Sequence, residues 1–391
     1  MKKIILVLII VVVLIVAVLL FYFNRSPKIE ITMAEDLSLE FLGEKKVSDF
    51  IISINGNIID DFLIDTTTVG KKTVDFTFIN DDNKKAEYSY EITITDNIPP
   101  VIWLGDTYTA TVESEIDLTE KIMCGDNADD NPEKYIEGDY DLNKIGNYPL
   151  TFVAIDSSGN ETRKDFTLKV IEKSSTVKPP SKTVTLFSDV VEKYKNENTQ
   201  IGIDISKWQG DIDFEKLKDA GVEFIIMRVG TAKGRDGEYV LDEKFEQNIT
   251  EANKHNIPVG IYYFSYATGI EHAISDARWV LKQIEGYKVD LPIVYDWENW
   301  SNFNSYEMSF YKLTASANAF LNTCAEHGFN GMLYGSKKYL EEIWMPTAYP
   351  IWLAHYTAKT DYEGGYMIWQ LCENGKVEGI NEPVDINVLY K

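Results

Sequence analysis

The chain opens with a single apolar run. Ile4 to Phe23 contains no charged residue and follows Met1-Lys2-Lys3. Roughly 20 apolar residues are enough to cross one bilayer as a helix. No small-residue cleavage pattern ends the run, so the sequence predicts an uncleaved transmembrane signal anchor over residues 1–24. The lysines before the run favour a single-pass orientation with residues 25–391 outside the cytoplasm.

From about Lys28 to Val170, apolar and polar residues alternate with a period of two, which is typical of half-buried strands. The pattern also repeats, because Val69-Gly70 and the apolar positions after it recur 76 residues later, beginning at Ile145-Gly146. Two prolines at 99–100 separate the copies. We therefore predict two small all-β sandwiches, over 25–97 and 98–172.

The pattern changes twice more along the chain. Residues 173–198 are predicted to be a linker, since Lys173 to Thr183 is rich in Ser, Lys and Pro; residues 184–198 fit either a short helix or more tether. Because this linker has little apolar surface, we expect no rigid docking of the sandwiches on the C-terminal domain. From Thr199 onward, apolar strands alternate with amphipathic helices, which predicts a mostly parallel, closed α/β barrel over 199–391.

Composition narrows the range of functions. A formal net charge of −24 argues against a nucleic-acid partner, because binding nucleic acid needs a basic face on the protein.

The three cysteines, Cys124, Cys324 and Cys372, lack metal-site spacing, so we expect buried thiols, with a Cys324–Cys372 bridge left open. The acidic loop 126–131 has oxygen ligands for calcium but lacks the ligand register of a calcium loop, and we interpret it as solvated. No metal or cofactor is predicted.

Two acids close one of the predicted barrel strands. The apolar run Leu291 to Val294 leads into Tyr295-Asp296-Trp297-Glu298. Side chains alternate along a strand, so Asp296 and Glu298 leave the same face. Adjacent carboxylates cannot both ionise cheaply, and one pKa therefore rises. A protonated acid beside an anion is the arrangement that glycoside hydrolysis uses.

Further polar residues follow the other predicted strands. Asp204 ends the first strand and Asp385 lies near the end of the chain. Because function collects at the carboxyl ends of barrel strands, we expect four acids to meet at one mouth. The other residues expected there are Trp208, Arg228, Tyr262, Tyr334, Trp352, Tyr356, Trp369 and Gln370. The aromatic rings would stack on sugars, and Arg228 would hold a carboxylate such as that of Asp204.

The motifs of the predicted barrel occur in the same order as in a known protein family. The matching segments are Gly202-Ile-Asp-Ile-Ser-Lys-Trp-Gln-Gly210, Phe224-Ile-Ile-Met-Arg228, Pro258-Val-Gly-Ile-Tyr-Tyr-Phe264, Asp296-Trp-Glu298, Trp352-Leu-Ala-His-Tyr356, Trp369-Gln370 and Val384-Asp-Ile-Asn387. Residues 199–391 resemble the family 25 glycoside hydrolases, the lysozymes called muramidases. The resemblance implies an irregular, TIM-like barrel. It also implies cleavage of the β-1,4 bond between N-acetylmuramic acid and N-acetylglucosamine in peptidoglycan.

The resemblance also implies roles for the acids. Glu298 would be the general acid. Asp296 would stabilise an oxazolinium-like intermediate formed by the substrate's own N-acetyl group, with direct attack by Asp296 left open. Asp204 and Asp385 would flank this pair. Tyr263 stands where His is frequent in the family, which is expected to alter a sugar contact.

The resemblance of the second sandwich is to bacterial immunoglobulin-like modules, through Asp156-Ser-Ser-Gly-Asn160 and the entry through two prolines. Expected partners are peptidoglycan strands and, through the anchor, the cell membrane; the oligomeric state stays open. Two other functions also stay open. One is a protein that binds wall glycan without cutting it, and the other is the lytic component of a secretion or conjugation apparatus.

Overall fold

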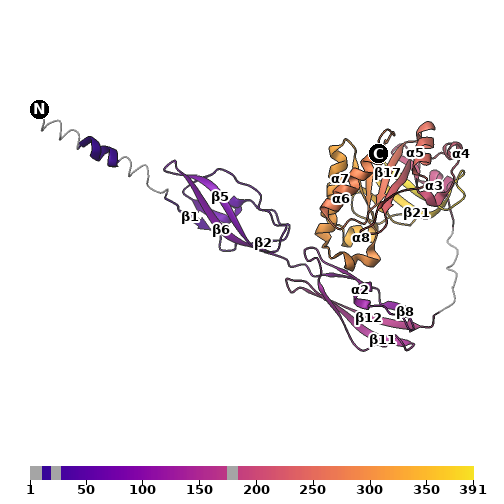
Figure 1. The fold of residues 1–391 in the computed structure, drawn as a ribbon, viewed down its shortest axis with the longest axis horizontal. Coiled ribbons are helices and arrows are strands. Elements are labelled where there is room, and N and C mark those ends of the chain that lie inside the picture. Colours follow the sequence, from indigo (N-terminus) through magenta and orange to yellow (C-terminus); the bar gives the residue numbers. More distant parts are fainter. Residues whose placement is uncertain (1–10, 19–27, 174–183) are drawn as a thin grey trace. The chain divides into compact units, whose positions relative to one another are not determined.

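The structure is a computed structural model that describes residues 11–18, 28–173 and 184–391 (Figure 1). It divides into two compact units, Met1–Asn97 and Ile98–Lys391. Most of the expected anchor, Ile4–Phe23, lies outside the described residues; within it, residues 11–18 are helical. None of the helices in the described part of the chain has the length and apolarity needed to span a membrane.

The first unit is built from two small sheets. One pairs β1 (Ile31–Met33) with β3 (Ile51–Ile54). The other has the order β2 (Ser38–Glu40), β6 (Lys85–Thr95), β5 (Gly70–Asn80) and β4 (Gly56–Ile58). Alternate residues of the long β5–β6 hairpin point inward, and Phe78, Ile92 and Ile94 are almost fully buried with Val47 and Phe50 from the 3-10 turn η1 (Val47–Phe50).

The second unit begins with a module of the same design, residues 98–172. Its larger sheet has the order β10 (Glu133–Glu137), β11 (Gly146–Ile155), β12 (Glu161–Ile171) and β8 (Thr107–Thr111). Its smaller sheet pairs β7 (Val101–Trp103) with β9 (Met123–Gly125), and α2 (Leu118–Lys121) precedes β9. Strands β11 and β12 begin 76 residues after β5 and β6, the offset seen in the sequence. The immunoglobulin-like assignment of both modules stays a prediction.

The rest of the second unit is an eight-stranded α/β barrel. Its strands are, in order around the barrel, β14 (Thr199–Ile205), β15 (Ile225–Ala232), β17 (Val259–Phe264), β18 (Ile293–Asp296), β19 (Gly331–Ser336), β20 (Ile351–Ala354), β21 (Ile368–Lys376) and β22 (Val384–Tyr390). Neighbours from β14 to β21 are parallel, whereas β22 is antiparallel to both β21 and β14 and closes the barrel. The expected barrel is confirmed, with one reversed strand as its irregularity.

Helices cover the barrel on the outside. They are α4 (Phe214–Asp219), α5 (Phe245–Lys254), α6 (Ile270–Gln283), α7 (Phe310–Glu326) and α8 (Lys337–Glu342); the short strand β16 (Tyr239–Leu241) extends β15. Strand alternation separates two buried layers. Tyr262 and Val294 belong to the cluster inside the barrel, and Tyr263 and Tyr295 belong to the layer beneath the helices.

Part of the expected linker 173–198 is folded. The strand β13 (Thr185–Leu186) pairs with β21, and α3 (Phe187–Tyr194) follows it. Phe187 and Val190 of this helix are buried in the barrel's core. The packed barrel unit therefore begins before Thr199, and the short-helix interpretation of residues 184–198 is the one that the structure supports.

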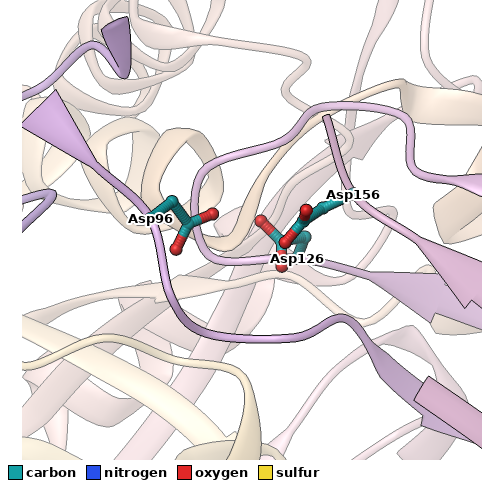
Figure 2. Close-up of side chains that lie close together, drawn as sticks. All are labelled: Asp96, Asp126 and Asp156. Carbon is teal, nitrogen blue, oxygen red and sulfur yellow. The ribbon is translucent and has the colours of Figure 1, made fainter. Parts of the chain in front are cut away.

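The acidic loop 126–131 is buried at its start, at Asp126 and Asn127, and becomes exposed only at Asn131, so the solvated interpretation was wrong for its first residues. Asp126 is 1% exposed, and its Oδ2 accepts the backbone N–H groups two and three residues further on, each at 2.8 Å. Asp156 lies close by, with a carboxylate oxygen within 4.8 Å of one from Asp126 (Figure 2). Asp156 accepts the N–H of Ser158 at 2.9 Å. Backbone donors thus stabilise both carboxylates inside the second module.

The three cysteines are buried and free, which confirms the expected thiols and excludes the Cys324–Cys372 bridge from this structure. Burial raises the pKa of Cys124 and of Cys324 to about 12. A thiol that stays protonated is a poor nucleophile, so these side chains act as small apolar residues.

Candidate active site

A cavity of about 290 Å³ lies inside the barrel, and every barrel strand except β15 contributes to it directly or through the loop after the strand. Its lining residues are Asp204, Tyr262, Asp296, Glu298, Tyr334, Trp352, Tyr356, Gln370, Glu373 and Asp385. All four predicted acids therefore meet in one place, together with four of the predicted aromatic residues and the predicted glutamine.

The first pair of acids sits at the end of β18. Asp296 is the last residue of this fully buried strand, and its side chain is hydrogen-bonded to that of Glu298. Glu298 is open to solvent, and partial desolvation by the surrounding protein raises its pKa. Burial, with the neighbouring charge of Glu298, raises the pKa of Asp296 well above its ordinary value. Both shifts favour the protonated carboxyl, so a pair that holds one proton is more stable than two adjacent anions. The Oδ1 atom of Asp296 is buried and accepts no hydrogen bond from the described residues.

The second pair joins two strands that are far apart in the sequence. Asp204 on β14 is the register partner of Asp385 on the antiparallel strand β22, and their side chains are hydrogen-bonded. Burial, followed by the charge of Asp204, raises the pKa of Asp385 to about 9. Asp204 accepts hydrogen bonds from Gln370 Nε2 at 2.9 Å and Asn387 Nδ2 at 2.8 Å. Burial raises the pKa of Asp204 as well, but these donors oppose that shift, so a proton held by the pair is favoured on Asp385.

Two amides connect this pair to the aromatic wall. Gln370 Oε1 accepts the hydroxyls of Tyr334 at 3.0 Å and Tyr356 at 3.1 Å. Asn387 Oδ1 accepts the indole N–H of Trp352 at 2.8 Å. Each amide thus uses its NH₂ group on Asp204 and its oxygen on a ring, and this orients the carboxylate and the rings together.

Two of these residues were absent from the predicted set. Asn387 lies in the predicted segment Val384-Asp-Ile-Asn387, two positions after Asp385 and therefore on the same face of β22, a spacing that could have identified it. Glu373 also lines the cavity. Its place follows from register shifts between β21 and β22, and no sequence pattern signals these shifts.

Three predicted residues lie outside the cavity lining. Trp208 is 69% exposed in the 3-10 turn η2 (Lys207–Gln209). Trp369 is buried in the core and donates its indole N–H to the His355 carbonyl at 2.8 Å. Arg228 does not pair with Asp204 as expected. Its Nε and Nη2 instead contact Asp242 Oδ2 at 2.8 and 2.7 Å, and this neighbour neutralises its charge.

Tyr263 does not face the cavity, so the expected change in a sugar contact is wrong. It follows Tyr262 on β17 and therefore points to the opposite side of the sheet. Its ring stacks on Phe320 of α7, and its hydroxyl lies 3.4 Å from Asp276 Oδ1. Tyr263 is a core residue beneath the helices.

The barrel domain is similar to a known family of proteins. The family described as "Glycosyl hydrolases family 25" matches residues 203–380. Residues 203–380 are thus similar to the family 25 glycoside hydrolases. The protein is accordingly an enzyme that hydrolyses glycosidic bonds, and the matched range includes Asp204, Asp296 and Glu298.

Curated relatives match the same half of the chain. The Uncharacterized protein YegX of Escherichia coli K12 is 27% identical over 195 residues, which is 48% of this chain and 68% of the relative. Lysozyme M1 of Streptomyces globisporus is 28% identical over 214 residues, 48% of this chain and 66% of the relative. The Autolytic lysozyme of Clostridium acetobutylicum is 23% identical over 189 residues, 48% of this chain and 54% of the relative.

Proposed function

We propose that the protein is a peptidoglycan hydrolase that cleaves the β-1,4 bond between N-acetylmuramic acid and N-acetylglucosamine. The observation that carries this is the Asp296–Glu298 pair, with Asp296 buried, Glu298 open to solvent and both pKa values raised, in an aromatic cavity of a domain that matches family 25. Two relatives named as lysozymes support the choice of substrate. A protein that only binds glycan would need no such acid pair, and the intact acids therefore count against that alternative.

Glu298 is the general acid in this proposal. It gives its proton to the glycosidic oxygen as the bond from that oxygen to the anomeric carbon breaks. The carbonyl oxygen of the substrate's N-acetyl group bonds to the anomeric carbon and forms an oxazolinium ion. Water then attacks that carbon, Glu298 takes the proton from the water, and the acetamide is restored.

Asp296 stabilises the positive ring. Its buried Oδ1 lacks a hydrogen-bond donor among the described residues, so it is free to accept the acetamide N–H of the substrate. Positive charge developing beside Asp296 favours its anion, and this leaves the shared proton on Glu298 at the moment it is needed. The orphaned oxygen is what favours this route over direct attack by Asp296.

The second pair supports the first. Asp204 and Asp385 hold one further proton in the same cavity, which reduces the negative charge facing Glu298. With Gln370 and Asn387 they also orient the rings of Tyr334, Tyr356 and Trp352 for contact with sugar.

The proposed site of action is the outer face of the cell membrane. The substrate lies outside the cytoplasm, and the apolar run Ile4–Phe23 is long enough for one crossing. Residues 25–391 would then be outside, with the β-modules between membrane and barrel. Protease treatment of intact protoplasts should release the barrel; a barrel protected until lysis would contradict this placement.

Mass analysis of sugar fragments tests the substrate and the bond together. The full chain, with its membrane run retained in detergent, should release fragments from purified sacculi that end in a reducing N-acetylmuramic acid. Fragments that end in reducing N-acetylglucosamine would show a different bond, and the absence of fragments would reject hydrolysis of this substrate.

A further inference from the structure

The loop after Glu298 is tied to the second β-module. The 3-10 segment η3 (Trp300–Tyr306) begins two residues beyond Glu298 and carries Asn304, which is buried. Asn304 Oδ1 accepts the backbone N–H of Cys124 at 2.9 Å. Its Nδ2 lies 2.9–3.2 Å from three backbone carbonyls of α2 and its C-terminal end, those of Thr119, Glu120 and Ile122. One side chain of the barrel thus caps the main chain of the module.

A second set of bonds fixes the far end of the same loop. The N–H of Phe310 at the start of α7 donates to the Asp126 carbonyl at 2.8 Å. The N–H of Ser309 donates to Asp130 Oδ1 at 3.1 Å, and the ammonium of Lys312 pairs with the same carboxylate. The loop 126–131, whose acids suggested a solvated turn, is therefore the surface of the module that receives α7.

Apolar packing fills the space between the two sets of bonds. A Cβ added to Gly125 of β9 would lie 2.5 Å from a ring atom of Phe310 and 2.7 Å from one of Phe303. Glycine is required there because both rings press on its backbone. Met123 of the same strand is part of the barrel's own buried core.

Aromatic stacking adds a third contact between the two parts. Trp103 of β7 stacks on Tyr339 at 4.4 Å between ring centroids, and Tyr339 stacks on Trp300 at 4.1 Å. The ammonium of Lys338 lies 4.1 Å from the centroid of Trp103. These ring faces are already occupied by other groups, so the stack serves as packing rather than as a platform for sugar.

The contacts continue to the acids themselves. Trp297 stands between Asp296 and Glu298 in the sequence and is 1% exposed. Its ring packs edge-on against Trp300, Tyr306 and Phe303 of η3, with centroids 4.7, 5.1 and 5.9 Å apart. A displacement of η3 therefore moves Trp297, and the two carboxylates flank that residue.

We propose that the second β-module, residues 98–172, is a positioning part of the active site: it holds residues 299–312 and thereby sets the geometry of the Asp296–Glu298 pair. Asn304 is the positioning residue at the centre of this interface. The inference rests on the proposed function only in taking that pair as the catalytic one. For the second sandwich alone, it replaces the expectation of no rigid docking on the barrel.

The test places one methyl group in the interface from the module's side. In the full chain, Gly125→Ala forces Phe303 and Phe310 to move without changing any barrel residue. The matched control is Gly105→Ala in the same module, where an added Cβ meets nothing within 4 Å. Hydrogen exchange of residues 297–312 reports whether the loop is held. Turnover of a soluble glycan fragment then reports whether holding it matters.

We expect Gly125→Ala to speed exchange of these amides and to lower kcat by at least about 10-fold, with KM within about 3-fold, since misplacement near 1 Å costs catalysis heavily. Gly105→Ala should match the unchanged protein in both readouts. Thermal unfolding, monitored by circular dichroism, gives the unfolded fraction of each variant, and the exchange rates and kcat are corrected for it. Unchanged exchange, or faster exchange with a normal kcat per folded molecule, would overturn the proposal.

A second variant keeps the test decisive if Gly125→Ala fails to fold. Asn304→Asp keeps the acceptor for Cys124 but removes the donor to three carbonyls. Asn143→Asp is its control, because Asn143 is exposed in the same β-module and lies outside residues 299–312. Only Asn304→Asp should lower kcat. If the protein without substitutions releases no sugar, the proposed function is rejected. The comparison of hydrogen exchange between the variants would still show whether the module holds the loop.

Discussion

The two carboxylate pairs of the cavity are built in opposite ways. Asp296 and Glu298 are two positions apart at the end of one parallel strand, and their proximity is a property of local strand geometry. Asp204 and Asp385 come from the two ends of the barrel domain and meet only because β22 runs antiparallel to β14. In the proposed function, the first pair carries out the chemistry and the second, which topology brings together, supports it.

The largest expected effect breaks the first pair. Glu298→Gln keeps the shape of the side chain but has no proton to give, so turnover on peptidoglycan should fall by roughly 10²–10⁴-fold. Binding of glycan fragments and the melting temperature should change little. Near-normal turnover would show that Glu298 is not the acid.

The next change removes the anion of the same pair. Asp296→Asn leaves the developing positive charge without its partner, and we expect a loss of roughly 10²–10³-fold in kcat. The pH profile of kcat sharpens this assignment. Activity should fall as pH rises through the raised pKa of Glu298, because the proton that is transferred is lost. Activity that continues to rise into the alkaline range would contradict a required acid.

The second pair should respond in stability more than in rate. The folded pKa of Asp385 is about 9, above its ordinary value of 3.8. Its contribution to the free energy of unfolding is therefore complete below about pH 4 and is lost as pH rises through about 9. Asp385→Asn cannot ionise, so at pH 9 its melting temperature should exceed that of the unchanged protein by more than roughly 2–4 °C, the shift that about 1 kcal/mol produces. The difference should vanish near pH 4, and turnover should fall less than in Glu298→Gln.

The smallest effect is expected at Tyr263, which lies on the strand next to Asp296 but faces away from the cavity. Tyr263 packs on Phe320 outside the barrel sheet, so Tyr263→Phe removes only its weak contact with Asp276. KM and kcat for glycan should stay within about 2-fold, as for a change that does not touch the site. A large rise in KM would place this side chain in a sugar contact after all.

The same contrast explains what sequence alone could predict. The Asp296–Glu298 pair, the alternation of strands and helices and the 76-residue repeat are local patterns, and the structure contains all three at the expected positions. The partner of Arg228 is Asp242, which follows the short strand β16 beside β15. The order of the predicted barrel strands does not show this neighbour, and Asp204 was therefore expected instead. Glu373 depends on bulges in β21.

The contacts of the loop 126–131 with the barrel were the hardest feature to predict from the sequence. Its acids are typical of a solvated turn, and the groups that bury it lie about 180 residues further along the chain. Asn304 and Ser309 carry no signal of their own in the sequence, because their partners are backbone atoms and one carboxylate of the module. Docking between modules depends on shape, which periodicity does not report.

The division of labour within the first pair has one most direct test. A β-glycoside of N-acetylmuramic acid with a dinitrophenolate leaving group needs no proton to depart, so it separates the acid from the stabilising anion. In the first turnover, Glu298→Gln should release dinitrophenolate at close to the normal rate while its turnover of peptidoglycan stays roughly 10²–10⁴-fold reduced, and Asp296→Asn should be impaired on both. Equal loss of both activities in Glu298→Gln would contradict the assignment of Glu298 as the proton donor.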